Sequence, residues 1–176
     1  MPNEPPPVDG PEETVDLVDE QDRVVGQAPR TTVRARNLLH REVAALVRNG
    51  RGEIYVHRRT ETKDVFPGKY DMFVAGVVKG GESYDDAIRR ELEEELGIEP
   101  TSPAFLLKTR YRDEDINWWT CVYEVTWDGP VRHQAEEIAW GGFMPQADLL
   151  ARLDRWPFVP DGLLVFRRYL SGRERP

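Results

Sequence analysis

The most regular feature of the chain is a series of short apolar segments separated by polar turns. Residues 41–48 hold a continuous apolar run, which is typical of a buried strand, and residues 53–59 alternate apolar and polar side chains with a period of two. Asn49 and Gly50 between them indicate a tight turn, so the two segments are predicted to form a hairpin. Further elements are predicted by the same criteria: a small hairpin at 14–25, a short helix at 29–37, strands at 70–78, 105–111, 118–127 and 138–143, and helices at 146–155 and 161–170.

Residues 84–96 have the clearest helix signals in the chain. Ser83 followed three residues later by Asp86 resembles a capping box with an acidic partner, which is typical of a helix start. Gly97 suits the left-handed conformation that ends many helices, and Ile98 supplies the apolar contact beyond it. The pattern therefore predicts a helix that begins at residue 84 and ends at residue 96.

Strands and helices interleave without a strict strand–helix–strand rhythm, which favours an α+β fold with a mixed sheet covered by helices. The length of 176 residues suits one domain. Residues 1–10 contain four prolines and no periodic apolar pattern, which predicts a flexible, acidic, proline-rich tail. Residues 11–172 are accordingly predicted to form a single domain.

Composition argues against several classes of protein. The longest apolar runs are far shorter than the roughly 20 residues that cross a bilayer, and the N-terminus has no recognisable secretory signal. The single cysteine, Cys121, forms no internal disulfide, which favours a reducing cytoplasm and argues against a thiolate zinc site. The 24 basic and 32 acidic side chains give a net charge of −8, which argues against nucleic-acid binding. We therefore expect a cytoplasmic protein.

Three glutamates of the predicted helix fall on one face. Residues three and four apart on a helix are neighbours, with Cβ atoms roughly 5–6 Å apart, so Glu91, Glu94 and Glu95 gather beside the apolar stripe. Like charges at this spacing repel one another, and a hard divalent cation such as Mg²⁺ would neutralise them through carboxylate oxygens. The alternative is a solvated acidic face, which is the usual role of a run of charges.

The order of residues around this helix resembles the signature of the Nudix hydrolases. The matching residues, which define a Nudix box at 76–98, are Gly76, Glu82, Arg90-Glu91-Leu92, Glu94-Glu95 and Gly97-Ile98. A chance match has a probability on the order of 10⁻⁸ at ordinary residue frequencies. The resemblance implies the Nudix fold, an α/β/α sandwich with a mixed β-sheet. It also implies hydrolysis of the diphosphate bond of a nucleoside-diphosphate-like or other diphosphate-linked small molecule, with Mg²⁺ or Mn²⁺ as cofactor.

The resemblance also implies a role for each polar residue of the box. These roles are metal ligation by Glu94, Glu95 and the backbone carbonyl of Ala75, ligation or base catalysis by Glu91, orientation of Glu91 by Arg90, and support of the loop or the metal shell by Glu82. The number of metal ions and the identity of the general base are left open by the sequence.

Outside the box, residues 39–41, 58–64 and 66–68 resemble hydrolases related to isopentenyl-diphosphate isomerase. These segments lie within residues 23–81, which carry 12 basic and 5 acidic side chains, whereas residues 82–99 carry 2 and 8. An acidic locus therefore follows a basic one. The candidates to bind phosphate are Arg58, Arg59, Lys63 and Lys69, although a solvated surface role is at least as frequent for any one of them.

Two alternatives compete with hydrolysis. The isomerase relies on a cysteine next to the motif glycine and a histidine just after it, but these positions are Ala75 and Val77 here, and only His40 matches another isomerase metal ligand. A non-catalytic nucleotide sensor usually lacks box carboxylates or carries a DNA-binding domain, and the sequence has neither feature. We therefore predict an enzyme that acts on a small-molecule diphosphate, with no nucleic-acid or membrane partner and with a homodimer as the default oligomer.

Several other residues are assigned to packing or to the surface. His57 is expected to be a satisfied or exposed strand histidine, and Cys121 is expected to pack in an apolar strand. The five tryptophans are expected mainly in the core. Glu136 and Glu137 precede a strand at which many relatives place an extra base or metal ligand, but a role without catalysis is favoured for them.

Overall fold

A computed structural model describes residues 12–99 and 102–173 of the chain. Its strands are β1 (Thr14–Val18), β2 (Val24–Pro29), β3 (His40–Arg48), β4 (Ile54–Arg59), β5 (Tyr70–Asp71), β6 (Val74–Val77), β7 (Ala104–Arg112), β8 (Asn117–Thr126) and β9 (Ile138–Met144). Its helices are α1 (Arg30–Ala35), α2 (Tyr84–Leu96), α3 (Gln146–Leu150) and α4 (Pro160–Arg173). The tail predicted at residues 1–10 lies outside the described residues.

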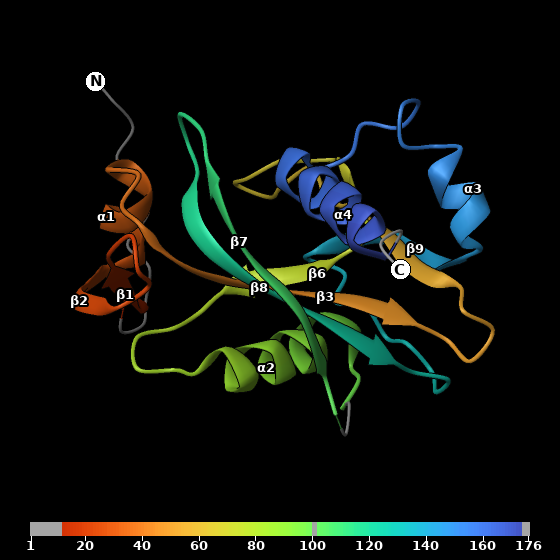
Figure 1. Ribbon diagram of the computed structural model, residues 1–176, viewed down its shortest axis with the longest axis horizontal. Helices are drawn as coiled ribbons and strands as arrows, with labels where there is room; N and C mark the ends of the chain where they lie inside the picture. The colour runs from red at the N-terminus through yellow and green to blue at the C-terminus, as the bar shows by residue number, and fades with distance from the viewer. Residues whose placement is uncertain (1–11, 100–101, 174–176) are drawn as a thin grey trace.

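A mixed sheet of seven strands forms the middle layer of the fold. Its central strand β3 runs parallel to β8 and antiparallel to β6, while β7 follows β8 at one edge and β4 pairs with β5 and β9. Helix α2 lies on one face of the sheet, and α3 and α4 lie on the other (Figure 1). The predicted α+β fold, an α/β/α sandwich with a mixed sheet, is confirmed.

The alternation of side chains along β3 builds a separate core on each face of the sheet. Val43, Ala45 and Val47 pack with the apolar face of α2, whereas Ala44 and Leu46 pack on the side of α4. All five side chains are buried. The continuous apolar run in the sequence therefore reflects a strand that is covered on both faces.

The hairpin predicted from residues 41–48 and 53–59 is only partly correct. β3 and β4 pair at the turn, through Arg48 and Ile54, and β4 then diverges to pair with β9 and β5. β6 and β8 take the places beside β3. A period-two pattern identifies a strand but does not identify its partner.

The single strand predicted at 70–78 was also wrong, because it is broken into β5 and β6. Asp71 Oδ1 accepts a hydrogen bond of 2.9 Å from the backbone N–H of Phe73 and stabilises a bend between the two strands. The helix predicted at 146–155 is likewise shorter, since α3 ends at Leu150 and turns follow it.

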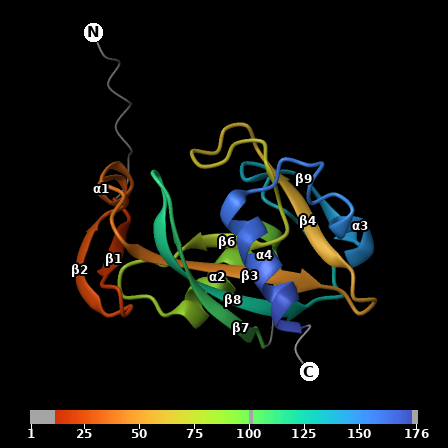
Figure 2. The same cartoon turned by 45° about the horizontal axis from the view of Figure 1, so that its top comes forward.

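β1, β2 and α1 form a small unit beside the start of β3, as the hairpin and short-helix predictions require (Figures 1 and 2). Val15 of β1 forms an isolated bridge with Lys79, just beyond β6. The backbone N–H of Arg30 donates a hydrogen bond of 2.9 Å to the carbonyl of Glu13. This unit brings Glu13 and Arg30 to the end of the sheet where β6 leads into α2.

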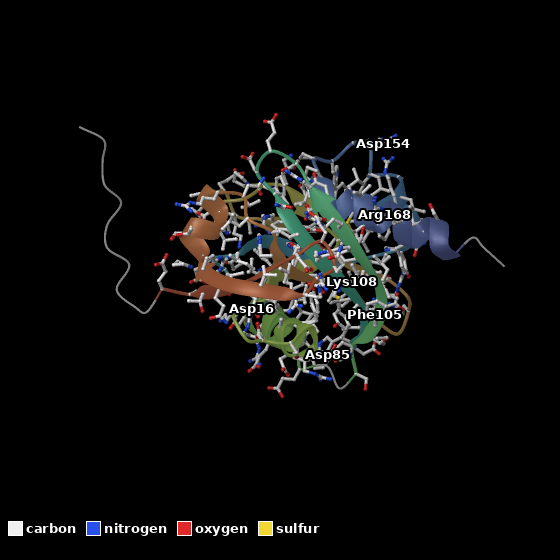
Figure 3. The ribbon with its side chains drawn as sticks, turned by 60° about the vertical axis from the view of Figure 1, so that its left-hand side comes forward. Asp16, Asp85, Phe105, Lys108, Asp154 and Arg168 are labelled. Carbon is white, nitrogen blue, oxygen red and sulfur yellow. The ribbon has the colours of Figure 1, made fainter. Side chains whose placement is uncertain are left out.

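Side-chain hydrogen bonds connect both helix layers to the edge of the sheet at β7 and β8. Arg168 of α4 donates a hydrogen bond to Thr109 of β7, and Tyr123 of the neighbouring β8 donates one of 2.6 Å to Asp85 of α2. Figure 3 shows Arg168 and Asp85 on opposite sides of the sheet edge. Within the described residues, no helix has the length and apolar character of a membrane span.

Candidate active site

Helix α2 begins and ends where its sequence predicts. At its N-terminus, Ser83 Oγ accepts a hydrogen bond of 3.1 Å from the backbone N–H of Asp86. At its C-terminus, Gly97 adopts a left-handed conformation with φ of 62°, and the backbone N–H of Ile98 donates to the carbonyl of Leu92. Local signals alone therefore fix the length of this helix.

The buried stripe of α2 determines which way its glutamates point. Glu91 and Glu95 are each only 8% exposed, whereas Glu94 is exposed at the rim. Burial raises the pKa of the Glu95 carboxyl to about 8, with repulsion from Glu91 as a second cause, and burial also raises the pKa of Glu91. Ionising both carboxylates therefore requires a positive charge nearby. The fully buried stripe consists of Ala87, Ile88, Leu92 and Leu96.

Arg90 connects the glutamates to the preceding loop. Its Nε and Nη2 donate hydrogen bonds of 2.8 and 2.9 Å to the two carboxylate oxygens of Glu82. Its Nη1 donates to Glu91 at 2.6 Å and to Glu94 at 3.3 Å, and Nη2 also donates to the carbonyl of Val77 at 3.1 Å. This forked geometry fixes the Glu91 carboxylate relative to β6.

Gly76 allows the Glu91 side chain to lie directly against β6. A Cβ atom at position 76 would overlap the Glu91 carboxylate. The φ of Gly76 is not in the left-handed region, so the requirement is for space and not for an unusual backbone conformation. The two motif glycines thus have different functions, since Gly97 is needed for its positive φ.

These groups line one cavity of about 190 Å³ beside β6. The acidic part of its wall is formed by Glu91, Glu94 and Glu95, and Ala75 of β6 also lines it. Lys63 and Arg30 contribute positive charge to the same wall. A negatively charged and a positively charged surface therefore share one cavity.

The comparison with known proteins agrees with this geometry. A model of the NUDIX domain matches residues 38–162, a segment that includes β6 and α2. The chain belongs to the Nudix family. A Nudix hydrolase of Streptomyces coelicolor is 54% identical over 164 residues, which cover 92% of this chain and 91% of that protein. A Nudix hydrolase of Pseudomonas aeruginosa is 41% identical over 164 residues, with coverage of 91% and 95%.

The fold comparison leads to the same family. The crystal structure of DR0079 from Deinococcus radiodurans has a TM-score of 0.77 and 34% sequence identity, and the match covers 89% of this chain and 98% of that one. The names of these relatives identify no substrate. Family membership therefore supports a Nudix hydrolase and leaves its substrate open.

The three glutamates of the Nudix box line one cavity. In this conformation their carboxylates are held by contacts within the protein and are not arranged around an ion. Within the two described segments, no three His, Cys, Asp or Glu side chains are grouped so that they could hold a metal ion. Arg90 instead bonds to both Glu91 and Glu94, while Glu95 lies deeper in the wall. Arg90 contacts only one carboxylate oxygen of Glu94, at 3.3 Å.

The four candidates for phosphate binding occupy different positions. Lys63 lines the box cavity and contacts Glu137, and Arg59 lines an adjoining second cavity, where it donates to the carbonyl of Val65. The loop of residues 60–69 that carries Lys63 projects beyond the sheet (Figure 2). The other two candidates line neither cavity: Arg58 pairs with Glu61 at 2.6 Å, and Lys69 lies 5.5 Å from the centre of the Phe66 ring.

Some residues of the site have no signal in the sequence. Arg30 lines both cavities, but it lies 61 positions before Glu91 in an Arg-rich connection that predicts only a short helix. Gln134 reaches the box cavity from the segment before β9, and so does Glu137, whose place before that strand had already marked it as a possible base or metal ligand. Glu136 does not line either cavity, and its carbonyl accepts a hydrogen bond of 2.9 Å from Thr60.

The remaining reactive side chains are structural in this conformation. Cys121 is buried in the core beside α2, as predicted, and burial raises the pKa of its thiol to about 11. His57 is 2% exposed, and its Nδ1 has no hydrogen-bond partner among the described residues, so the expectation of a satisfied or exposed histidine was wrong. Burial lowers its pKa to about 3, which keeps the ring neutral. Of the tryptophans in the described parts of the chain, only Trp118 lines either cavity, and it lines the second one.

Proposed function

We propose that this Nudix protein hydrolyses the diphosphate bond of a nucleoside-diphosphate-like or other diphosphate-linked small molecule, with Mg²⁺ or Mn²⁺ as cofactor. The observation that supports this proposal is one cavity in which buried Glu91 and Glu95 lie with Arg30 and Lys63. A diphosphate bound to a divalent cation needs both kinds of partner, because basic side chains bind its oxygens and carboxylates bind the cation.

The acidic part of the cavity fits a divalent metal ion. Burial raises the pKa of both Glu91 and Glu95, so a cation would offset the cost of ionising them in the same cavity. Glu91, Glu94, Glu95 and the backbone carbonyl of Ala75 would hold it, since hard cations prefer oxygen ligands. Such an ion, when bound, activates water and neutralises charge on the phosphoryl group.

Side chains of the chain itself hold the reacting groups in position. The hydrogen bond of 2.6 Å from Arg90 fixes the Glu91 carboxylate, either as a ligand or as the base that receives a proton from water. Glu82 in turn fixes Arg90 through two hydrogen bonds. Lys63 and Arg30, which pair with Glu137 and Glu13 in the same cavity, would bind phosphate oxygens.

The assignment of this chain to a subgroup of the Nudix family is also a proposal. Residues 39–41, 58–64 and 66–68 support a place among hydrolases related to isopentenyl-diphosphate isomerase. Isomerase activity itself is disfavoured, because Ala75 and Val77 line the box cavity and neither side chain exchanges a proton. We propose a cytoplasmic, single-domain hydrolase with a small-molecule substrate, no nucleic-acid or membrane partner, and a homodimer as its oligomer.

Turnover is tested with a panel of nucleoside diphosphates, nucleotide sugars, dinucleoside polyphosphates, coenzyme-type diphosphates and isopentenyl diphosphate, each with Mg²⁺ and with Mn²⁺. Glu94→Gln should lower kcat/KM for the best substrate by about 100-fold or more. Glu93→Gln is the matched control, because it removes the same charge from an exposed neighbour that does not line the cavity, and it should change kcat/KM by less than about twofold.

Three outcomes would contradict this proposal. Unchanged turnover by Glu94→Gln would show that the metal site is wrongly assigned. Tight nucleotide binding without phosphate release from any member of the panel would support a sensor. Conversion of isopentenyl diphosphate into dimethylallyl diphosphate would support an isomerase.

A further inference from the structure

Residues 12–37, which contain β1, β2 and α1, lie before the segment that the NUDIX model matches, yet they supply part of the wall of the box cavity. We call them the N-terminal unit (Figure 1). Glu13, just before β1, and Arg30, the first residue of α1, both line the cavity. Neither belongs to the Nudix box. The matched domain alone therefore does not form the whole wall of this cavity.

Hydrogen bonds attach the N-terminal unit to the loop between β6 and α2. The backbone N–H of Gly80 donates a hydrogen bond of 2.8 Å to the carbonyl of Thr14. The backbone N–H of Gly81 donates one of 3.0 Å to the carboxylate of Asp16, which is only 4% exposed. Because this loop leads into α2, the unit is held in a defined position relative to the glutamates of that helix.

Glu13 contacts Arg30 at two points. Its carbonyl accepts a hydrogen bond of 2.9 Å from the backbone N–H of Arg30, and its Oε2 accepts one of 2.7 Å from Arg30 Nη1. Its Oε1 lies 3.4 Å from Nζ of Lys79, in the loop between β6 and α2. Burial acts to raise the pKa of Glu13, but Arg30 and then Lys79 lower it overall, so an ionised carboxylate bridges the two cations.

This contact leaves part of the Arg30 guanidinium to a ligand. A guanidinium has five N–H donors, and the Glu13 carboxylate accepts from Nη1 alone. The other donors suit a forked contact with two oxygens of a phosphate. The Glu13 carboxylate therefore fixes the direction of the fork and does not occupy it.

We propose that Glu13 is a positioning residue of the active site, which holds Arg30 in the orientation that binds a phosphate group of the substrate. This inference rests on the proposed function. An arginine that is already held by its neighbour loses less conformational freedom when phosphate binds, so Glu13 lowers KM without touching the reacting atoms. The opposite arrangement, in which Glu13 competes with phosphate for Arg30, would raise KM.

The experiment measures kcat and KM separately for Glu13→Gln, Arg30→Ala and the double variant, with the best diphosphate of the panel. Glu12→Gln is the matched control, because Glu12 also contacts α1, through Thr31, but lines neither cavity. The ion pair of Glu13 and Arg30 is partly exposed and contributes little to stability, so each variant should fold. Tm is measured on the same preparations.

Glu13→Gln should raise KM by about fivefold, the ratio expected for a partly exposed ion pair, and change kcat by less than about twofold. Because Glu13 acts through Arg30, adding Glu13→Gln to Arg30→Ala should raise KM by less than about twofold more. Glu12→Gln should leave both constants unchanged. An unchanged or lower KM in Glu13→Gln, a fall in kcat alone, or an equal rise in KM in both backgrounds would each overturn the proposal.

A binding measurement distinguishes failure of this inference from failure of the proposed function. Methylenediphosphonate, a diphosphate mimic that is not hydrolysed, is titrated by calorimetry into the wild type, Glu13→Gln and Glu12→Gln in metal-free buffer. A Kd that is about fivefold weaker in Glu13→Gln alone would support the positioning role even if the wild type hydrolyses no member of the panel. Equal Kd in all three proteins, or no binding by the wild type, would overturn it.

Discussion

Replacing Gly76 with alanine would place a methyl group where the Glu91 carboxylate now lies. Alanine fits the backbone at this position, because φ is not in the left-handed region. The overlap is with the end of a flexible side chain, so rotation of Glu91 relieves it at a cost near the low end of overpacking, about 1 kcal/mol of unfolding free energy. For a chain of this size, Tm would fall by about 2–4 °C. The displaced carboxylate would lose its position against Arg90, and a shift of about 1 Å in a reacting group lowers the rate by about 100-fold.

The assay for Gly76→Ala measures kcat/KM with the best diphosphate of the panel and Tm on the same preparation. Gly26→Ala is the matched control, because a Cβ at position 26 meets nothing within 4 Å and its φ is not positive, so neither quantity should change. Wild-type kcat/KM in Gly76→Ala would refute the idea that this glycine makes room for a catalytic carboxylate. A chain that no longer folds would refute the small cost assigned to moving Glu91.

Two further predictions concern stability. Ser83→Ala removes the acceptor for the Asp86 N–H at the start of α2 and should lower the unfolding free energy by about 1 kcal/mol, seen as a fall in Tm with unchanged activity per folded molecule; calorimetry that finds no fall would contradict the cap. Burial, followed by repulsion from Asp161, raises the pKa of Asp71 to about 7 from 3.8, so the folded chain holds this proton more tightly than the unfolded chain does. Ionisation of Asp71 should therefore lower the free energy of unfolding by roughly 4 kcal/mol as pH rises from about 4 to about 7. Asp71→Asn should remove that loss. Urea unfolding curves that respond to pH equally in the wild type and the variant would contradict this prediction.

The helix of the Nudix box is predictable from sequence because its signals are local. Ser83, Gly97 and the apolar stripe between them act within a few residues of one another, and α2 has the predicted bounds. The partners of β3 are different, because pairing depends on segments far apart in the chain. Nothing in residues 41–59 indicates that β8 and not β4 runs along the length of β3.

The difference between local signals and long-range contacts also explains which parts of the candidate site can be predicted from the sequence. The three glutamates and Arg90 meet because helical spacing brings them together, and Gly76 joins them through one short strand. Arg30 reaches the cavity through a separate N-terminal unit. Three carboxyl groups that line the second cavity, Glu42, Asp71 and Asp161, come from β3, β5 and α4, so only tertiary packing brings them together.

β6 is only four residues long, yet it forms a wall common to both cavities. The carboxylates on its two sides come from different elements, and none of the glutamates of α2 lines the second cavity. Substitutions around the carboxyl groups of the second cavity can therefore accumulate over evolution without altering the residues of the Nudix box. The fold therefore allows the lining of one cavity to diverge among related proteins while the lining of the other is kept.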